Sequence, residues 1–365
     1  MKFAIDKDIF LSGLQKQQGI APAKAMLPII QNVLLETTDD GHLNVWATDL
    51  DISLRCRLVC EVEEQGKITL PVRRIVGIVR ESDSGMIHIE SESNGMVKVK
   101  AGTSRFKILG LPADDFPPIP KSEGEPAIVL PQGTLKEMLK KTGYAASEDN
   151  TRHVLNGVLL ERKEGKLTSV ATDGRRLSIV EHEAVINADK DFSVILPSKS
   201  VNEVMKLLGE KTEVSIYVRN GHAIFDFGNE VLGSRLVDGA YPNYRQVIPA
   251  CPSNKAIVCR EDMIAVLKRV SVMTTQQSDS LKLSFEDNKL TVSVNSPDVG
   301  EGKDCMDISY TGAAINTCFK GEYLLEMLKN DDIDKITIGI ENGMSPILVD
   351  GGNNAAYVVM PLRIS

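Results

Sequence analysis

Three segments of this chain repeat one pattern at intervals of about 124 residues. The stretches around Thr48 and Thr172 both read Ala-Thr-Asp after an apolar-alternating run, and the two threonines lie 124 positions apart. A third copy of the pattern begins at Phe285, where Leu290 lies 123 positions after Leu167. Repeats of about 20 to 50 residues are typical of solenoids and propellers, whereas this period is the length of a whole small domain. The sequence therefore predicts three copies of one domain.

Short proline- and serine-rich stretches separate the copies. They lie at 117–126 (PPIPKSEGEP) and 249–255 (PACPSNK), and their composition is typical of linkers. We therefore expect domains at 1–122, 126–250 and 253–365. The chain has 365 residues, of which 42% are hydrophobic, so it is long enough to build two or three cores of ordinary size.

The fold class follows from turn chemistry and from the number of helical patterns. Dipeptides that favour tight hairpins lie between apolar runs at Asp40-Gly41, Asn94-Gly95, Asn220-Gly221 and Asn342-Gly343. A parallel sheet would need a helix after almost every strand, but each copy has only about two helical patterns. The prediction is an α+β fold of three repeated domains, each with two helices packed on antiparallel sheets.

All six predicted helices carry basic residues opposite their apolar faces. In the clearest case, Val201, Val204 and Leu208 follow helical spacing, so Lys199 and Lys206 project from the other side. The corresponding basic residues of the other five helices are Lys7, Lys16, Arg73, Arg80, Lys140, Lys268 and Lys329. On one helix such residues are ordinary solubilising side chains. On six repeat-related helices they would form a positive lining if symmetry brought them to one concave surface, which suits a protein that surrounds a polyanion.

Composition limits the classes of protein that need to be considered. The net charge of −8 argues against a generic nucleic-acid binder, because nonspecific affinity comes from basic residues that neutralise phosphates. No run of 18 apolar residues exists and the N-terminus MKFAIDKDIF has no continuous apolar segment, so we expect no membrane span or signal peptide and a cytoplasmic location. The six cysteines form no CxxC pair and are expected to be reduced thiols.

Catalytic chemistry has little support. The five histidines lack metal-ligand spacing, and no G-x-S-x-G motif is present, so we expect neither a metal nor another cofactor. Asp49 and Asp173 are the only candidate catalytic carboxylates. Each directly follows a predicted strand, where an aspartate commonly caps a turn through the backbone. A hydrolase that uses both aspartates remains an alternative to this turn interpretation.

Five segments together carry a family resemblance. They are MLPIIQNVLLE (26–36), SRFKILGLPADDFP (104–117), VATDGRRLS (170–178), YPNYRQVIP (241–249) and YVVMPLRI (357–364). In this order and at this spacing, the whole chain resembles the bacterial DNA sliding clamps, the beta subunits of DNA polymerase III. The resemblance implies a non-enzymatic processivity factor, in which two chains join head to tail as a closed ring that slides on duplex DNA. It also implies an ATP-driven clamp loader, as well as replicative and repair polymerases that bind through short, glutamine-containing peptides with apolar ends.

The resemblance implies three sets of functional residues. The DNA-facing set is Lys24, Arg73, Lys140, Lys199, Lys206 and Lys268. The peptide pocket is Arg152, Leu155, Thr172, Gly174, Arg175, Arg176, Leu177, Pro242, Val247, Ser345, Val359, Met360, Pro361 and Leu362. The dimer contact sets Phe106 and Ile108 against Val272 and Met273 of the second chain.

Several residues in these sets have other interpretations. Arg152 and Arg176 are expected at the pocket edge, where they would meet a peptide carboxylate or carbonyl.

This chain departs from the family at two positions. At Asp149, family members have a neutral polar residue that contacts DNA. At Gln246, family members often have a basic residue. The terminal strand could instead complete its own core, as could Phe106. A peptide-binding scaffold with no role on DNA is a second alternative function.

Overall fold

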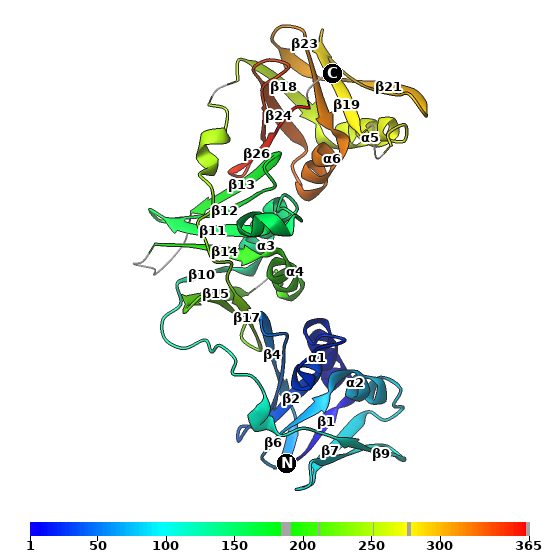
Figure 1. The fold of residues 1–365 in the computed structure, drawn as a ribbon, viewed down its shortest axis with the longest axis vertical. Helices are drawn as coiled ribbons and strands as arrows, with labels where there is room; N and C mark the ends of the chain where they lie inside the picture. Colours follow the sequence, from blue (N-terminus) through cyan, green and yellow to red (C-terminus); the bar gives the residue numbers. More distant parts are fainter. Residues whose placement is uncertain (184–190, 211, 251, 276–278, 363–365) are drawn as a thin grey trace. The chain divides into compact units, whose positions relative to one another are not determined.

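A computed structural model of the chain describes residues 1–183, 191–210, 212–250, 252–275 and 279–362. These residues form two compact units (Figure 1). Among them, unit 1 contains residues 1–132 and 206–236, and unit 2 contains the others. The middle repeat contributes strands to both units, so the compact packing does not follow the repeat boundaries.

Unit 1 contains two antiparallel sheets. The five-stranded sheet has the order β5-β1-β7-β8-β9 and the eight-stranded sheet the order β10-β15-β16-β17-β4-β3-β2-β6. The bounds of the first sheet are β1 Lys2–Asp6, β5 Glu61–Glu64, β7 Met86–Ser91, β8 Met96–Ala101 and β9 Ser104–Leu109. Those of the second are β2 Asn32–Thr37, β3 His42–Thr48, β4 Ile52–Val59, β6 Lys67–Pro71, β10 Ile128–Pro131, β15 Glu213–Arg219, β16 His222–Asp226 and β17 Glu230–Arg235.

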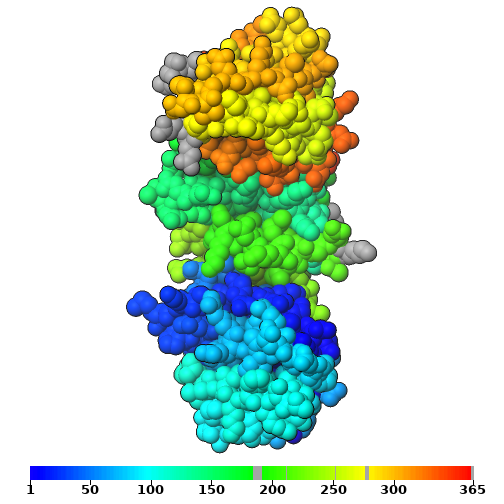
Figure 2. Space-filling view, turned by 90° about the vertical axis from the view of Figure 1, so that its right-hand side faces the viewer, coloured from blue at the N-terminus to red at the C-terminus, as the bar shows by residue number. Residues whose placement is uncertain are grey.

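Two helices cover these sheets, α1 (Lys7–Ile20) and α2 (Val72–Arg80). Asp6 caps α1, since its carboxylate accepts hydrogen bonds from the backbone of Asp8 and Ile9 at 2.9 and 3.1 Å. The two helices lie side by side against the strands (Figure 1), and Phe10, Leu14, Ile75, Val76 and Val79 are buried there. In the space-filling view, the cyan region around residue 100 forms a continuous surface, as expected for a sheet that ends in the edge strand β9 (Figure 2).

Unit 2 also contains two antiparallel sheets. The nine-stranded sheet has the order β14-β11-β12-β13-β26-β25-β24-β18-β22 and the four-stranded sheet the order β21-β20-β19-β23. The bounds of the first are β11 Gly157–Lys163, β12 Lys166–Thr172, β13 Arg176–Glu183, β14 Phe192–Pro197, β18 Asn254–Cys259, β22 Ser309–Thr311, β24 Lys335–Ile340, β25 Ile347–Asp350 and β26 Ala355–Val359. Those of the second are β19 Ser280–Glu286, β20 Lys289–Ser296, β21 Gly300–Asp307 and β23 Ile315–Lys320.

The remaining helices are α3 (Gln132–Gly143), α4 (Ser198–Leu207), α5 (Arg260–Ser271) and α6 (Gly321–Asn330). Each repeat therefore supplies two helices, and every strand pair in the described residues is antiparallel, which confirms the predicted α+β class. No helix in this part of the chain has both the length and the apolar character needed for a membrane span.

Three of the four predicted hairpin dipeptides adopt the expected backbone. Asn220 and Gly221 join β15 to β16 with φ angles of +51° and +73°, and both Gly41 and Gly95 also have positive φ. The fourth prediction was wrong, because Asn342-Gly343 lies in a longer connection and neither residue has positive φ. The glycine there has another cause, since a Cβ atom would collide with the carbonyl oxygen of Asn316.

Two strand pairs join residues from neighbouring repeats. We call the pairing of β4 with β17 in unit 1 the first junction, and that of β13 with β26 in unit 2 the second junction. Both are antiparallel ladders of five residue pairs. Their side chains differ strongly.

Candidate functional site

A tight turn precedes β13 at the second junction. The Thr172 hydroxyl donates to the carbonyl oxygen of Arg176 at 2.6 Å and accepts from the backbone of Gly174 at 3.0 Å. The Asp173 carboxylate accepts from the backbone N–H groups of Arg175 and Arg176 at 2.8 and 3.0 Å. These bonds confirm the interpretation of Asp173 as a turn-capping residue.

Asp49 makes the same arrangement before β4. Its carboxylate accepts from the backbone N–H groups of Asp51 and Ile52 at 3.0 and 2.7 Å. Both aspartates are therefore used to fix turns, and these bonds favour the structural interpretation over the hydrolase alternative. Within the described residues, no group of three or more metal-ligating side chains is close enough to hold an ion.

An apolar pocket of about 170 Å³ opens beside this turn. Nine predicted residues line it, namely Leu155, Thr172, Gly174, Arg175, Arg176, Leu177, Pro242, Val247 and Met360. Three lining residues were not predicted, namely Asn243, Tyr244 and Val358. The sequence signal for Asn243 and Tyr244 was present in the YPNYRQVIP segment.

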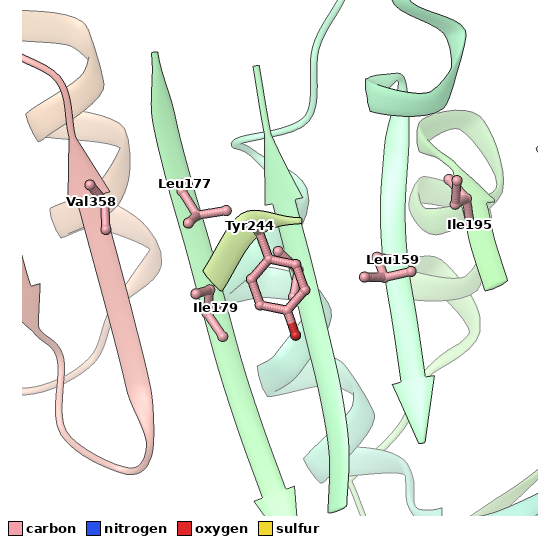
Figure 3. Close-up of a cluster of buried hydrophobic side chains, with 7 residues drawn as sticks. Leu159, Leu177, Ile179, Ile195, Tyr244 and Val358 are labelled. Carbon is pink, nitrogen blue, oxygen red and sulfur yellow. The ribbon is translucent and has the colours of Figure 1, made fainter. Parts of the chain in front are cut away.

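The pocket floor is part of a buried apolar cluster in unit 2. Leu177 and Val358 face each other across the second junction and are 3% and 2% exposed. In Figure 3, Tyr244 lies next to Ile179 and Leu177, on the short helix Tyr244–Val247. Because the floor is packed before any ligand arrives, a bound apolar side chain would enter a preformed site. At the mouth, Val247 and Met360 remain 51% and 41% exposed.

The prediction that Val359 lines the pocket was wrong, because its neighbour Val358 does so. Successive side chains of a strand point to opposite faces, so only one of the two can face the pocket. The pairing of Leu177 with Val358 in the register of β26 decides which one. Val359 is buried on the opposite face.

Three further pocket predictions do not match the lining. Ser345 lies in the connection between β24 and β25. Pro361 and Leu362 follow β26, and the backbone N–H of Leu362 donates to the carbonyl oxygen of Cys318 at 2.8 Å, which holds this segment beside β23. Pro361 and Leu362 directly follow the lining residue Met360 in the chain, but neither lines the pocket.

Arg176 was expected to offer its guanidinium to a peptide, but its nitrogens already have partners within the chain. Although Arg176 lines the pocket, its side chain is 11% exposed and its nitrogens contact Asp173, Glu326 and the carbonyl oxygen of Tyr144. The guanidinium also lies 5.3 Å from the ring centre of Tyr144 and 4.6 Å from that of Tyr323. Burial opposes the charged form, but the hydrogen bond and charge of Glu326 outweigh it and raise the pKa of Arg176. This arginine joins elements of the second and third repeats.

Arg152 lies outside the apolar pocket. It is 53% exposed and donates to the carbonyl oxygen of Asp173 at 3.2 Å. Together with Asp149, Arg175 and Lys320 it lines a charged depression of about 340 Å³. Asp149 caps the short helix that follows it, and hydrogen bonds from Thr151 hold the pKa of its carboxyl below the ordinary value. Gln246 is exposed and does not line the apolar pocket.

The predicted DNA-facing residues are not equally exposed. Lys24, Arg73, Lys199, Lys206 and Lys268 are all exposed. Lys140 is half-buried, and its ammonium lies 2.8 Å from the Asp332 carboxylate. The hydrogen bond from Lys140 lowers the pKa of Asp332. Lys16 of α1 is similarly paired with Glu230 at 2.5 Å. The expected outward positive charge is therefore neutralised at two of these lysines.

The predicted dimer residues belong to edge regions of the two units. Phe106 is 40% exposed and Ile108 half-buried on the edge strand β9 of unit 1. Val272, just after α5 in unit 2, is 77% exposed. Met273 is half-buried against β21, since a Cβ on Gly302 would lie 3.1 Å from its Cγ. An exposed edge with apolar side chains is typical of a surface that a partner covers.

A threefold α+β repeat with two helices per copy and only antiparallel sheets is the architecture of a clamp protein. Three family models match consecutive parts of the chain. They describe the N-terminal, central and C-terminal domains of the DNA polymerase III beta subunit and match residues 1–120, 129–243 and 245–363. The chain belongs to the DNA polymerase III beta subunit family, the bacterial beta sliding clamps.

Known relatives agree over the whole length. The beta sliding clamp of Chlamydia muridarum (strain MoPn / Nigg) is 32% identical over 366 residues, which cover 100% of this chain and 99% of that protein. The DNA polymerase sliding clamp from Bacillus subtilis superposes with a TM-score of 0.96 at 27% identity, and full coverage of both chains. The Pseudomonas aeruginosa sliding clamp bound to griselimycin gives a TM-score of 0.94 at 31% identity, again with full coverage of both chains.

Proposed function

We propose that this chain acts as a processivity factor. Two copies would form a closed ring around duplex DNA and tether polymerases to it. The observation that carries this proposal is the match to beta-subunit structures over 100% of both chains at a TM-score of 0.94. The proposal assigns no catalytic role to any residue and places the protein in the cytoplasm with the DNA that it encircles.

DNA contact is proposed to be weak, dispersed and independent of sequence. Lys24, Arg73, Lys199, Lys206 and Lys268 would meet phosphates, which carry no sequence information. Lys140 would contribute less, because Asp332 already neutralises its charge. A ring is retained by topology, so a protein with a net charge of −8 needs no strong electrostatic affinity.

Ring closure is proposed to use the two exposed edges described above. Phe106 and Ile108 of one chain would pack against Val272 and Met273 of the other. Such a head-to-tail contact closes after two subunits and leaves no free end. A clamp loader must then open the ring on DNA.

The apolar pocket is proposed to bind short peptide segments of polymerases, the loader and repair proteins. Its open mouth at Val247 and Met360 and its packed floor at Leu177 and Val358 suit a peptide that ends in apolar side chains. Arg175 is exposed at the rim and provides a cation for a peptide carboxylate or carbonyl. Arg176 does not take this role.

Retention on circular DNA tests the ring. The protein would be loaded by a clamp loader onto nicked circular DNA, isolated by gel filtration and treated with a restriction enzyme that cuts once. Loss of bound protein only after cutting is expected, because linear DNA has ends from which a ring slides. Equal retention on circular and cut DNA would contradict topological binding.

Truncation of residues 360–365 separates the two proposed surfaces. The truncated protein should lose polymerase binding, because Met360 lines the pocket, but should keep the native mass of a dimer. Analytical ultracentrifugation measures the mass. A monomeric truncated protein would contradict the proposed separation of pocket and dimer contact.

The hydrolase alternative is tested by replacing both aspartates, Asp49→Asn and Asp173→Asn. The double variant should keep its retention on DNA if the ring proposal holds, whereas a hydrolase would lose its turnover.

A further inference from the structure

Unit 1 contains a second pocket at the first junction, and its turn repeats that of the peptide pocket bond for bond. The Thr48 hydroxyl donates to the carbonyl oxygen of Ile52 at 2.9 Å and accepts from the backbone of Leu50 at 3.0 Å. Thr172 makes the same two bonds before β13. Asp49 caps its turn as Asp173 does. The backbone that frames one side of each pocket is therefore the same.

On the other side of each pocket, the strand pairing is also the same at the two junctions. Ser53 faces Gly233 across the first junction, and the backbone N–H of Arg235 donates to the carbonyl oxygen of Asp51 at 2.7 Å. At the second junction Leu177 faces Val358, and the N–H of Met360 donates to the carbonyl oxygen of Arg175 at 2.9 Å. A proline-containing segment lines both pockets, with Pro117 in the first and Pro242 in the second. The two sites are structural equivalents.

Their side chains are not equivalent. Ser53 and Gly233 occupy the positions of Leu177 and Val358, so the floor of the first pocket has lost both large apolar groups. Arg235, two residues after Gly233 and thus on the same face of β17, corresponds to Met360. It is exposed beside the first pocket and is not one of the residues that line it. The resulting cavity is about 500 Å³, against about 170 Å³ for the peptide pocket.

We propose that Ser53, Gly233 and Arg235 are specificity-determining residues, which exclude apolar-ended peptides from the first junction and leave one peptide site per chain. This inference rests on the proposed function of the second junction as the peptide site. According to this proposal, three side chains determine which of the two equivalent junctions binds the peptide.

The physical reason is the loss of a complementary apolar floor. A single missing methylene in an apolar pocket changes binding by about 10- to 200-fold, and here leucine, valine and methionine side chains are absent. The Ser53 hydroxyl is already buried, and an apolar side chain placed over it would offer it no hydrogen bond. Next to the pocket, the exposed Arg235 has a charge where the second junction has the apolar Met360. An apolar-ended peptide should therefore bind the first junction at least about 100-fold more weakly than the second.

The first arm of the test removes the peptide site. The triple variant Leu177→Ser, Val358→Gly, Met360→Arg gives the second junction the side chains of the first. A fluorescein-labelled short peptide that contains glutamine and ends in apolar side chains serves as the probe, and its anisotropy reports binding. We expect about 100-fold weaker binding than to the wild type. Binding reduced less than about 10-fold would overturn the inference, because the three positions would then not determine affinity.

The second arm builds a site at the first junction. In the background of that triple variant, Ser53→Leu, Gly233→Val and Arg235→Met should restore probe binding. In the wild-type background the same graft should raise the stoichiometry, measured by calorimetry, from one peptide per chain to two. A folded graft that restores no binding would overturn the inference, and so would a wild-type chain that already binds two.

A milder graft protects the test against misfolding. A Cβ on Gly233 would lie 2.7 Å from the Ser53 hydroxyl and 3.7 Å from Pro120, so the valine needs some local adjustment. Ser53→Leu with Arg235→Met leaves Gly233 in place and should restore part of the affinity. Thermal melting and retention on circular DNA identify folded variants. A wild-type chain that binds no probe would instead refute the proposed peptide site itself.

Discussion

The two junctions share one backbone ladder but are held by different side chains. At the first junction, Lys16 of α1 reaches Glu230 of β17, and both side chains are substantially exposed. At the second, Arg176 lies between two tyrosine rings, and Lys141, Asp331 and Tyr357 form a buried network. The two junctions therefore have the same strand pairing but differ in the burial of the side chains beside it. At the second junction these buried contacts lie next to the peptide pocket.

The buried network connects helix α3 to the end of α6 and to β26. Lys141 is 2% exposed, and its ammonium lies 2.8 Å from Glu137 and 3.5 Å from Asp331. The Tyr357 hydroxyl donates to the other oxygen of Asp331 at 2.6 Å. Tyr357 precedes the pocket residue Val358, so this network fixes the strand that forms the pocket wall.

The largest effect is expected from breaking the buried pair. Asp331→Ala should lower the free energy of unfolding of unit 2 by about 3 kcal/mol, because it leaves the buried Lys141 with Glu137 as its remaining carboxylate and removes the acceptor of the Tyr357 hydroxyl. Glu230→Ala is the matched control at the first junction, where an exposed pair contributes at most about 1 kcal/mol. Urea unfolding measures both. Equal losses would remove the proposed difference between the junctions.

A smaller loss in the free energy of unfolding is expected for Arg176→Met. The variant removes the contacts to Tyr144, Tyr323 and Glu326, which should lower this free energy by about 2–3 kcal/mol. It should also weaken binding of the probe peptide, because the pocket wall would be displaced. Arg176→Lys keeps the charge but not the planar stacking and should recover only part of either property. Full recovery by lysine would show that charge alone is needed. Arg55→Met, which removes a half-buried arginine near Trp46, is the control in unit 1.

Tyr357→Phe removes one hydrogen bond from the network and should cost about 1–2 kcal/mol at neutral pH. Burial, aided by the hydrogen bond to Asp331, raises the pKa of the Tyr357 hydroxyl above its ordinary value of 10.0. A raised folded-state pKa gives stability that is fully present below pH 10 and is lost as pH rises further.

Lys141 should also contribute stability that is lost as pH rises above about 10. Burial alone would lower its pKa, but the hydrogen bond that it donates to Glu137 and the charge of Asp331 raise it above 10.5. Melting temperatures between pH 8 and about 11 should therefore fall for the wild type. They should fall less steeply for Tyr357→Phe, and a slope equal to that of the wild type would exclude a contribution from this hydroxyl.

The smallest effect concerns the exposed pair of Lys140 and Asp332. The hydrogen bond from Lys140 holds the pKa of Asp332 below 3.8, so the pair stabilises the fold above that pH and loses this contribution as pH falls. Lys140→Met should return the carboxyl pKa toward 3.8, as measured by NMR titration, with at most about 1 kcal/mol of stability lost. Lys136→Met is the control. An unchanged Asp332 pKa would show that the ion pair does not form in solution.

The sequence by itself determined the features that depend on local pattern and repetition. The period of about 124 residues predicted three copies, and helical spacing placed Lys199, Lys206 and Lys268 on exposed faces. The Thr-Asp turns followed from local hydrogen bonding, which needs only neighbouring residues. The segments of the peptide pocket were also recognisable, since nine of its predicted residues line the cavity.

Only the tertiary structure decided which side chains meet across long distances in the chain. The register of β26 chose Val358 over Val359, because a shift of one residue reverses the face of every side chain in a strand. The Arg176 side chain is enclosed by residues of the second and third repeats. Of the two neighbouring lysines, Lys141 is the one whose ammonium is buried. Such pairings depend on partners more than 100 positions away, which no local pattern specifies. The repeat therefore gave two equivalent frames, and tertiary packing formed a preformed apolar floor at only the second junction.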